Sequence, residues 1–162
     1  MDKPQTQLTE THPTKGPTSA EVDTATNTLR LRRSIAAPVS RVFEAWTTPG
    51  ILAKWWDPDG RPLRECEIDL RPGGAFRFVN QGHEDGRAFT GTYREIASPQ
   101  RLVFETMGAE GRVDFVERNG KTDITVAIVC ASPDHLQQFL TFGVADDTGR
   151  TLDQLVAYFE AS

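Results

Sequence analysis

Six strand-like segments between residues 65 and 130 constrain the fold more than any other feature of the sequence. Apolar residues recur within these segments with a period of two, as in AFRFV and TDITVAIVC, which is typical of strands that bury one face. Turn sequences separate the segments, and the pairs Asp85-Gly86 and Asn119-Gly120 are strong signals for tight hairpins. Because hairpins join antiparallel neighbours, the run predicts an antiparallel meander.

Helical patterns flank this run on both sides. Before it, residues 29–35 are predicted as a strand, followed by two short helices in VSRVFEAW and GILAKWW. After it, the chain ends in its longest amphipathic segment, whose apolar residues follow helical spacing at Leu152, Leu155, Val156 and Phe159. This last helix is the only predicted element long and apolar enough to cover the meander. We therefore expect an α+β fold in which the sheet curves around it.

Residues 1–27 are predicted to be a disordered N-terminal tail, which leaves residues 28–162 as one domain. All 14 Phe, Trp and Tyr residues lie beyond the tail. A polar segment without them buries too little apolar surface to offset the entropy that is lost on ordering.

Charge and motifs argue against several classes of function. The net charge of −5 gives no electrostatic reason to bind nucleic acid or an anionic membrane. No segment approaches the roughly 18 apolar residues of a membrane span, and the N-terminus lacks the apolar core of a secretory signal, so we expect a cytoplasmic protein. His12, His83 and His135 have no second metal-type ligand nearby in sequence, and no nucleophile or phosphate-loop motif is present. We expect no metal and no cofactor, and a non-enzymatic role over a catalytic one.

Several short motifs occur in an order and spacing that resemble a known family. They are Ile35-Ala36-Ala37-Pro38, Trp55-Trp56, DLRPGG at 69–74, GTYREI at 91–96 and RLVF at 101–104. Over about residues 28–160 the sequence resembles the activator of heat-shock protein 90 ATPase homologue family, within the START-like (SRPBCC) helix-grip superfamily. The resemblance implies a seven-stranded antiparallel sheet that grips the C-terminal helix, with a deep hydrophobic cavity between them. It does not fix the function, because the superfamily includes lipid carriers, hormone receptors, cyclases and co-chaperone domains.

The sequence departs from the family just before the last helix. Relatives usually carry a Gly-Trp pair there, whereas this chain has GVADDT at 143–148 and no tryptophan. We expect that end of the cavity to be wider or more polar than in relatives.

Aromatic and apolar side chains of the strands, the second short helix and the last helix are the candidates for the cavity wall. They are Trp55, Trp56, Phe76, Phe78, Phe89, Tyr93, Phe104, Phe115, Leu152, Leu155 and Phe159. We expect most of the strand aromatics to belong to the core. Adjacent helical residues point about 100° apart, so one of the two tryptophans is expected to pack under the short helices and the other to line the cavity mouth. The alternative is that both only pack. The hydroxyl of Tyr93, if buried, needs a partner and could orient a ligand.

Arg33 is the most unusual candidate, because a period of two places it on the apolar face between Leu31 and Ile35. A buried arginine must be paired, and Glu95 or Glu105 are the candidate partners. Arg33 could instead bind a carboxylate or phosphate of the ligand, or a β-bulge could turn it outward.

Cys66 and Cys130 are predicted to be free, mostly buried thiols. In the family topology their strands are expected to flank the first strand, which separates them by roughly 9–10 Å. A disulfide tolerates a Cα separation of about 7 Å at most.

Three functions remain open from the sequence. The first is binding of a hydrophobic lipid, acyl or aromatic molecule by a monomer or homodimer. The second is an enzyme of the cyclase or hydrolase type that uses polar residues inside the cavity, for instance Arg33, Glu95 and Tyr93. The third is a co-chaperone-like interaction module.

Overall fold

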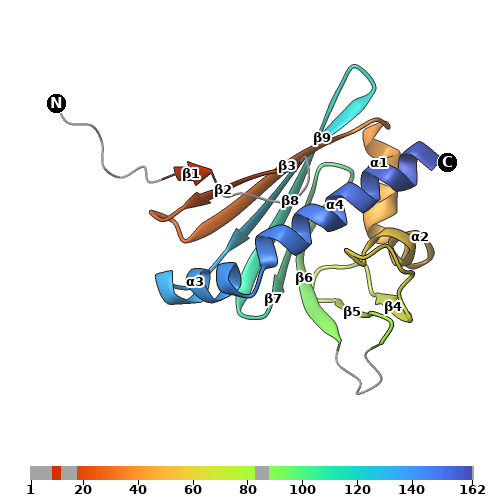
Figure 1. Cartoon of the computed structure of the whole chain (residues 1–162). Helices are drawn as coiled ribbons and strands as arrows, with labels where there is room; N and C mark the ends of the chain where they lie inside the picture. The colour runs from red at the N-terminus through yellow and green to blue at the C-terminus, as the bar shows by residue number, and fades with distance from the viewer. Residues whose placement is uncertain (1–8, 12–17, 83–87, 162) are drawn as a thin grey trace.

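The computed structural model describes residues 9–11, 18–82 and 88–161. Four helices are α1 (Val39–Thr47), α2 (Pro49–Trp55), α3 (Pro133–Thr141) and α4 (Val144–Ala161) (Figure 1). The strands are β1 (Thr9–Thr11), β2 (Ser19–Asp23), β3 (Thr28–Ile35), β4 (Glu65–Ile68), β5 (Ala75–Val79), β6 (Phe89–Ala97), β7 (Arg101–Thr106), β8 (Ala109–Arg118) and β9 (Lys121–Val129). In the described part of the chain, no helix is long and apolar enough to cross a membrane.

The strands form one antiparallel sheet in the order β1-β2-β3-β9-β8-β7-β6-β5-β4. The predicted meander accounts for β4 to β9, in which each strand pairs with the next along the chain. In the hairpin between β8 and β9, Asn119 and Gly120 have φ angles of 53° and 80°. Two consecutive positive φ angles are the backbone of a type I′ turn, as the Asn-Gly pair predicts.

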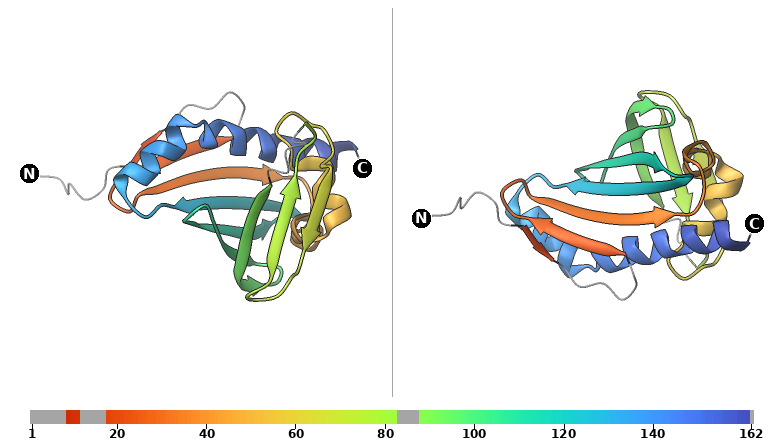
Figure 2. Two further views of the ribbon diagram at one scale, coloured as in Figure 1. Left: turned by 90° about the horizontal axis from the view of Figure 1, so that it is seen from below. Right: turned by 90° about the horizontal axis from the view of Figure 1, so that it is seen from above.

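Helix α4 packs against β3 and β2 and is flanked by α2 and α3. Figure 2 shows that β4, β5 and β6 turn steeply away from the direction of β3, so that the sheet curves around α4. A register shift between Tyr93 and Glu95 lies in β6, and such bulges bend a strand and increase its twist. The predicted helix-grip architecture is confirmed.

The N-terminal segment differs from the prediction of a tail over 1–27. Residues 19–23 form β2, which pairs with β3, and β1 pairs with β2 in turn, so the described residues form a sheet of nine strands and not seven. Ala20 and Val22 are buried opposite Leu31 and Leu29. The open edge of β3 supplies backbone partners, so two small apolar side chains suffice for a strand there. The remaining parts of the predicted tail, residues 1–8 and 12–17, lie outside the described residues.

The two cysteines are free, as predicted. The expected place next to β3 is right for β9, which Cys130 follows, and wrong for β4, which carries Cys66 and forms the far edge of the sheet. Cys130 is buried and Cys66 is half-buried. Burial raises the pKa of both thiols, that of Cys66 to about 11.

Candidate functional site

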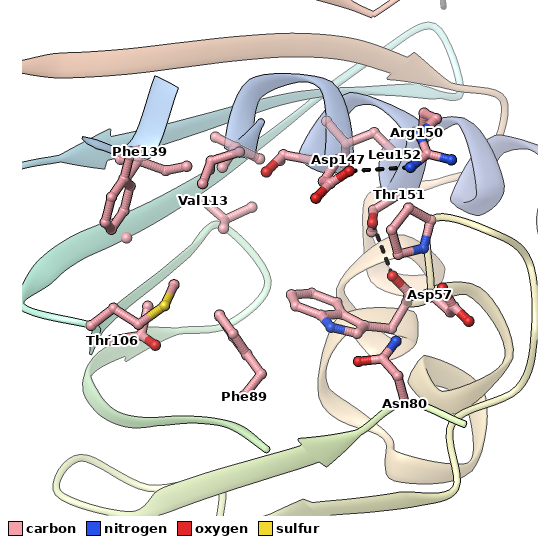
Figure 3. A pocket seen from close by; sticks show the side chains of 18 of the residues that line it. Asp57, Asn80, Phe89, Thr106, Val113, Phe139, Asp147, Arg150, Thr151 and Leu152 are labelled. Atoms are coloured by element: carbon pink, nitrogen blue, oxygen red, sulfur yellow. Dashed lines mark hydrogen bonds and ion pairs between the residues drawn. The ribbon is translucent and has the colours of Figure 1, made fainter. Parts of the chain in front are cut away.

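A cavity of about 460 Å³ lies between α4 and the sheet (Figure 3). Side chains from α1, α3, α4, the segment after α2 and strands β6 to β9 all contribute to its wall. Of the residues predicted to line it, the structure places four in the wall, namely Trp56, Phe89, Phe104 and Leu152. Segments far apart in the chain therefore converge on one cavity.

Most of the wall is apolar. Phe89 and Phe104 come from β6 and β7, Val113 from β8, and Phe139 from α3. Figure 3 shows Phe139 and Val113 at one end of the cavity and Phe89 on its floor. This end favours a ligand with an apolar body, because an unpaired polar group there would lose its hydration without replacement.

A glycine makes room for one of these aromatic rings. The ring of Phe104 lies over Gly111 of the neighbouring strand β8. A Cβ atom on Gly111 would lie 2.4 Å from the nearest ring carbon of Phe104. Only a residue without a side chain lets Phe104 lie flat over β8 and form part of the wall.

The other end of the cavity is charged. Arg150 of α4 donates to Asp59, with an Nη1–Oδ1 distance of 2.8 Å, and to Asp147, with an Nη2–Oδ1 distance of 3.1 Å. The hydrogen bonds that Arg150 donates to the carboxylates of Asp59 and Asp147 raise the pKa of its guanidinium. The hydroxyl of Thr151 donates to the main-chain oxygen of Trp56 at 2.9 Å, which ties α4 to the segment after α2 (Figure 3).

Asp57 is the most buried charged group in the cavity wall, with a relative exposure of 3%. Its Oδ1 accepts a hydrogen bond from the main-chain N–H of Asp59 at 3.0 Å. Its Oδ2 lies 3.4 Å from Nε of Arg61. Within the described residues, no group of three or more His, Cys, Asp or Glu side chains is placed to hold a metal ion.

The three tryptophans have different environments. Trp55 is fully buried, its indole N–H donates to the carbonyl of Ala45 at 3.1 Å, and it lies outside the cavity wall. Trp56 and Trp46 both line the cavity. The structure thus places one of the adjacent tryptophans in the core under the short helices and the other at the cavity. Trp46 belongs to the core as well as to the wall.

Phe76, Phe78 and Tyr93 lie behind the main cavity, around a space of only about 20 Å³. Such a volume holds about one water molecule, so these three rings pack against each other and do not enclose a ligand. Gly91 leaves room for Phe76, because a Cβ there would lie 2.3 Å from its ring. Burial raises the pKa of the Tyr93 hydroxyl well above its usual range.

Three further predicted residues lie away from the cavity. Phe115 packs edge-on against Phe43, with ring centroids 5.4 Å apart, and belongs to the core. Leu155 is fully buried. Phe159, near the C-terminal end of α4, lies under the guanidinium of Arg41 at 5.3 Å. The apolar stripe of α4 is longer than the cavity, so only part of the stripe contributes to the cavity wall.

Arg33 also lies outside the cavity wall. It points toward α4 and pairs with Asp153 there, with an Nε–Oδ1 distance of 3.3 Å. The predicted partners are wrong, because Glu105 pairs with Arg94 and Glu95 is exposed on β6. The predicted bulge is also absent, since β3 pairs with β9 over its whole length without a register shift. The unseen partner lies 120 positions away on a helix, beyond the reach of strand periodicity.

No local motif marks the charged end of the cavity. Asp57 and Asp59 belong to a turn that Arg61 follows, and turn residues of this kind are common where no site exists. Asp147 and Arg150 resemble ordinary solvated residues of an amphipathic helix. Only the tertiary structure shows that Asp59 of the DPDG turn meets Arg150 of α4.

Comparisons with known proteins agree with this architecture. The family model described as Activator of Hsp90 ATPase homolog 1-like protein matches residues 36–160. A solved structure from Mycobacterium smegmatis is 26% identical with a TM-score of 0.75, over 90% of this chain and 99% of that chain. One from Nitrosomonas europaea is 25% identical with a TM-score of 0.74, over 83% of this chain and 94% of that chain. The AHSA1-like protein from Aeromonas hydrophila is 24% identical with a TM-score of 0.62, over 82% of this chain and 92% of that chain, and has a similar fold. No curated protein matches the chain.

Proposed function

The chain belongs to the Activator of Hsp90 ATPase homolog 1-like protein family, and on that premise we propose that it binds a hydrophobic small molecule between α4 and the sheet. The cavity of about 460 Å³ is the observation that carries this proposal. Ligand pockets typically measure about 300–1,000 Å³ and combine apolar walls with a few polar groups. In this role the protein is a carrier or receptor and not a catalyst.

The division of the wall indicates how a ligand would lie. Its apolar body would contact Phe89, Phe104 and Phe139, and its polar end would point toward Asp57 and Arg150. Lipids, acyl chains and aromatic molecules with one polar end share this pattern. Asp57 pairs with Arg61 and Asp59 with Arg150 at that end, which lowers the cost of placing an apolar ligand beside these charges.

The cyclase or hydrolase alternative loses the cluster on which it depends. Arg33 is paired with Asp153, Glu95 is exposed, and Tyr93 lies behind the cavity. These three residues therefore share no substrate space. The co-chaperone alternative draws on the name of the family, and a pull-down that recovers a chaperone of the Hsp90 type would favour it.

A pair of variants on α4 tests the binding proposal. Thr148 lines the cavity, whereas Ala157 on the same helix is exposed. We expect Thr148→Phe to fill part of the cavity and to weaken binding of dodecan-1-ol or 2-acetylnaphthalene in isothermal titration calorimetry. Ala157→Phe is the matched control and should bind as the unmodified protein does.

Native mass spectrometry of the purified protein supplies a second readout. We expect a small molecule that co-purifies with the Ala157→Phe protein and is depleted from the Thr148→Phe protein. Equal occupancy in both variants would contradict the proposal, as would the absence of any bound molecule together with no binding of either probe.

A further inference from the structure

Within the described part of the chain, the indole N–H of Trp46 is a buried donor without an acceptor. The side chain has a relative exposure of 6%, and its Nε1 has no hydrogen-bond partner among the described residues. Buried N–H groups are nearly always paired, and each exception needs a physical explanation. An acceptor supplied by a ligand is one such explanation.

The neighbouring indole, that of Trp55, has an acceptor for its N–H. The rings of Trp46 and Trp55 meet edge to face, with centroids 5.0 Å apart. Trp55 lies outside the cavity wall and donates to Ala45, whereas Trp46 lines both the main cavity and the small space behind it. The tryptophan with the unpaired donor is therefore the one that borders the cavity.

The charge of the cavity indicates which acceptor fits. Its charged wall residues comprise three carboxylates and two guanidinium groups, at Asp57, Asp59, Asp147, Arg61 and Arg150. The excess of negative charge disfavours an anionic group inside the cavity, since like charges repel in a medium of low dielectric constant. An indole N–H, which is uncharged, suits an uncharged oxygen.

We propose that the ligand is a flat, apolar molecule whose body carries a carbonyl oxygen, and that this oxygen accepts a hydrogen bond from Nε1 of Trp46. The aromatic wall at Trp56, Phe89 and Phe104 favours an aryl ketone over a plain hydrocarbon chain. The inference rests on the proposed binding function and narrows it to one chemical class.

Two probes of nearly the same shape test this hydrogen bond. In 2-isopropenylnaphthalene a CH₂ group replaces the carbonyl oxygen of 2-acetylnaphthalene, so the pair differs in the acceptor alone. Calorimetry gives the affinity ratio of ketone to alkene for the unmodified protein, Trp46→Phe and Trp55→Phe. We expect Trp46→Phe to lower this ratio by about 2- to 12-fold, the range for one neutral hydrogen bond. Trp55→Phe also removes an indole N–H, but one outside the cavity, and should leave the ratio unchanged.

A measurement on the unmodified protein covers the case in which Trp46→Phe does not fold. In ¹H–¹⁵N NMR spectra, the ketone should shift the indole proton of Trp46 downfield, whereas the alkene should not. A ratio unchanged in Trp46→Phe, or lowered equally in Trp55→Phe, would overturn the inference and leave the binding proposal standing. Failure of both probes to bind would also overturn it, and a co-purified ligand depleted by Thr148→Phe would then still support binding.

Discussion

The contact between Gly111 and Phe104 leads to a prediction whose size follows from the structure. A methyl group on Gly111 would lie 2.4, 2.5 and 3.1 Å from three ring carbons of Phe104. The left-handed backbone region is not involved, because the φ angle of Gly111 lies outside it. The ring must therefore move into the cavity or the two strands must separate. Forced overpacking of this kind costs about 1–3 kcal/mol.

The same substitution also has a smaller, stabilising effect through the unfolded chain. Replacing glycine by alanine restricts the unfolded chain and stabilises the fold by about 0.4–1 kcal/mol where the backbone allows it. We expect Gly111→Ala to be less stable by about 1–2 kcal/mol in urea unfolding. For a domain of this size that loss lowers Tm by about 2–8 °C.

Gly50 provides the matched control. It lies in α2, and a Cβ there would meet no atom within 4 Å. Gly50→Ala should therefore stabilise the protein by up to about 1 kcal/mol. In addition, Phe104→Leu should cost less in the Gly111→Ala background than alone, because the shorter side chain relieves the contact. A Gly111→Ala protein as stable as Gly50→Ala, or strict additivity with Phe104→Leu, would refute the reasoning.

Three further predictions concern other parts of the molecule. Burial raises the pKa of Cys66 from 9.0 to about 11, so the folded state keeps the thiol proton that the unfolded state releases. The free energy of unfolding should therefore fall between pH 9 and pH 11. Cys66→Ala should flatten that part of the stability profile, and an unchanged profile would contradict the raised pKa of Cys66. Thr151→Val removes the donor to the carbonyl of Trp56 and should cost about 1 kcal/mol in chemical denaturation, whereas no loss would mean that water replaces the bond. Asp153→Ala leaves the half-buried Arg33 unpaired and should lower the free energy of unfolding by roughly 2–4 kcal/mol. Adding Arg33→Met should recover part of this stability. A double variant less stable than Asp153→Ala would be inconsistent with an ion pair between the two residues.

The strands and the last helix could be predicted because their signals are local. A period of two marks the buried face of β9, and the Asn-Gly pair marks the turn before it. Strand β2 escaped prediction because its five residues include only two buried apolar side chains, Ala20 and Val22. Its stability depends on the adjacent edge of β3, which is a tertiary property.

Some residues of the cavity could likewise be predicted from the sequence, and others could not. Phe89 and Leu152 could be predicted as wall residues from their place on apolar faces. Phe76 and Phe115 share that pattern and yet lie away from the main cavity. Periodicity identifies the apolar face of an element, but it does not say whether a residue on that face packs in the core or borders the cavity. The charged end could not be predicted, since Asp59 and Arg150 meet across 91 positions of sequence.

The clustered tryptophans give the protein an optical property of its own. The ring centroids of Trp46, Trp55 and Trp56 lie 5.0, 5.9 and 6.3 Å apart in pairs. Indoles this close pass electronic excitation to one another before they emit, so the three fluoresce as one unit. Of the three tryptophans, a quencher inside the cavity would contact only Trp46 and Trp56. It would nevertheless lower the emission of the buried Trp55 as well. Occupancy of the cavity can thus be followed by intrinsic emission, without a label.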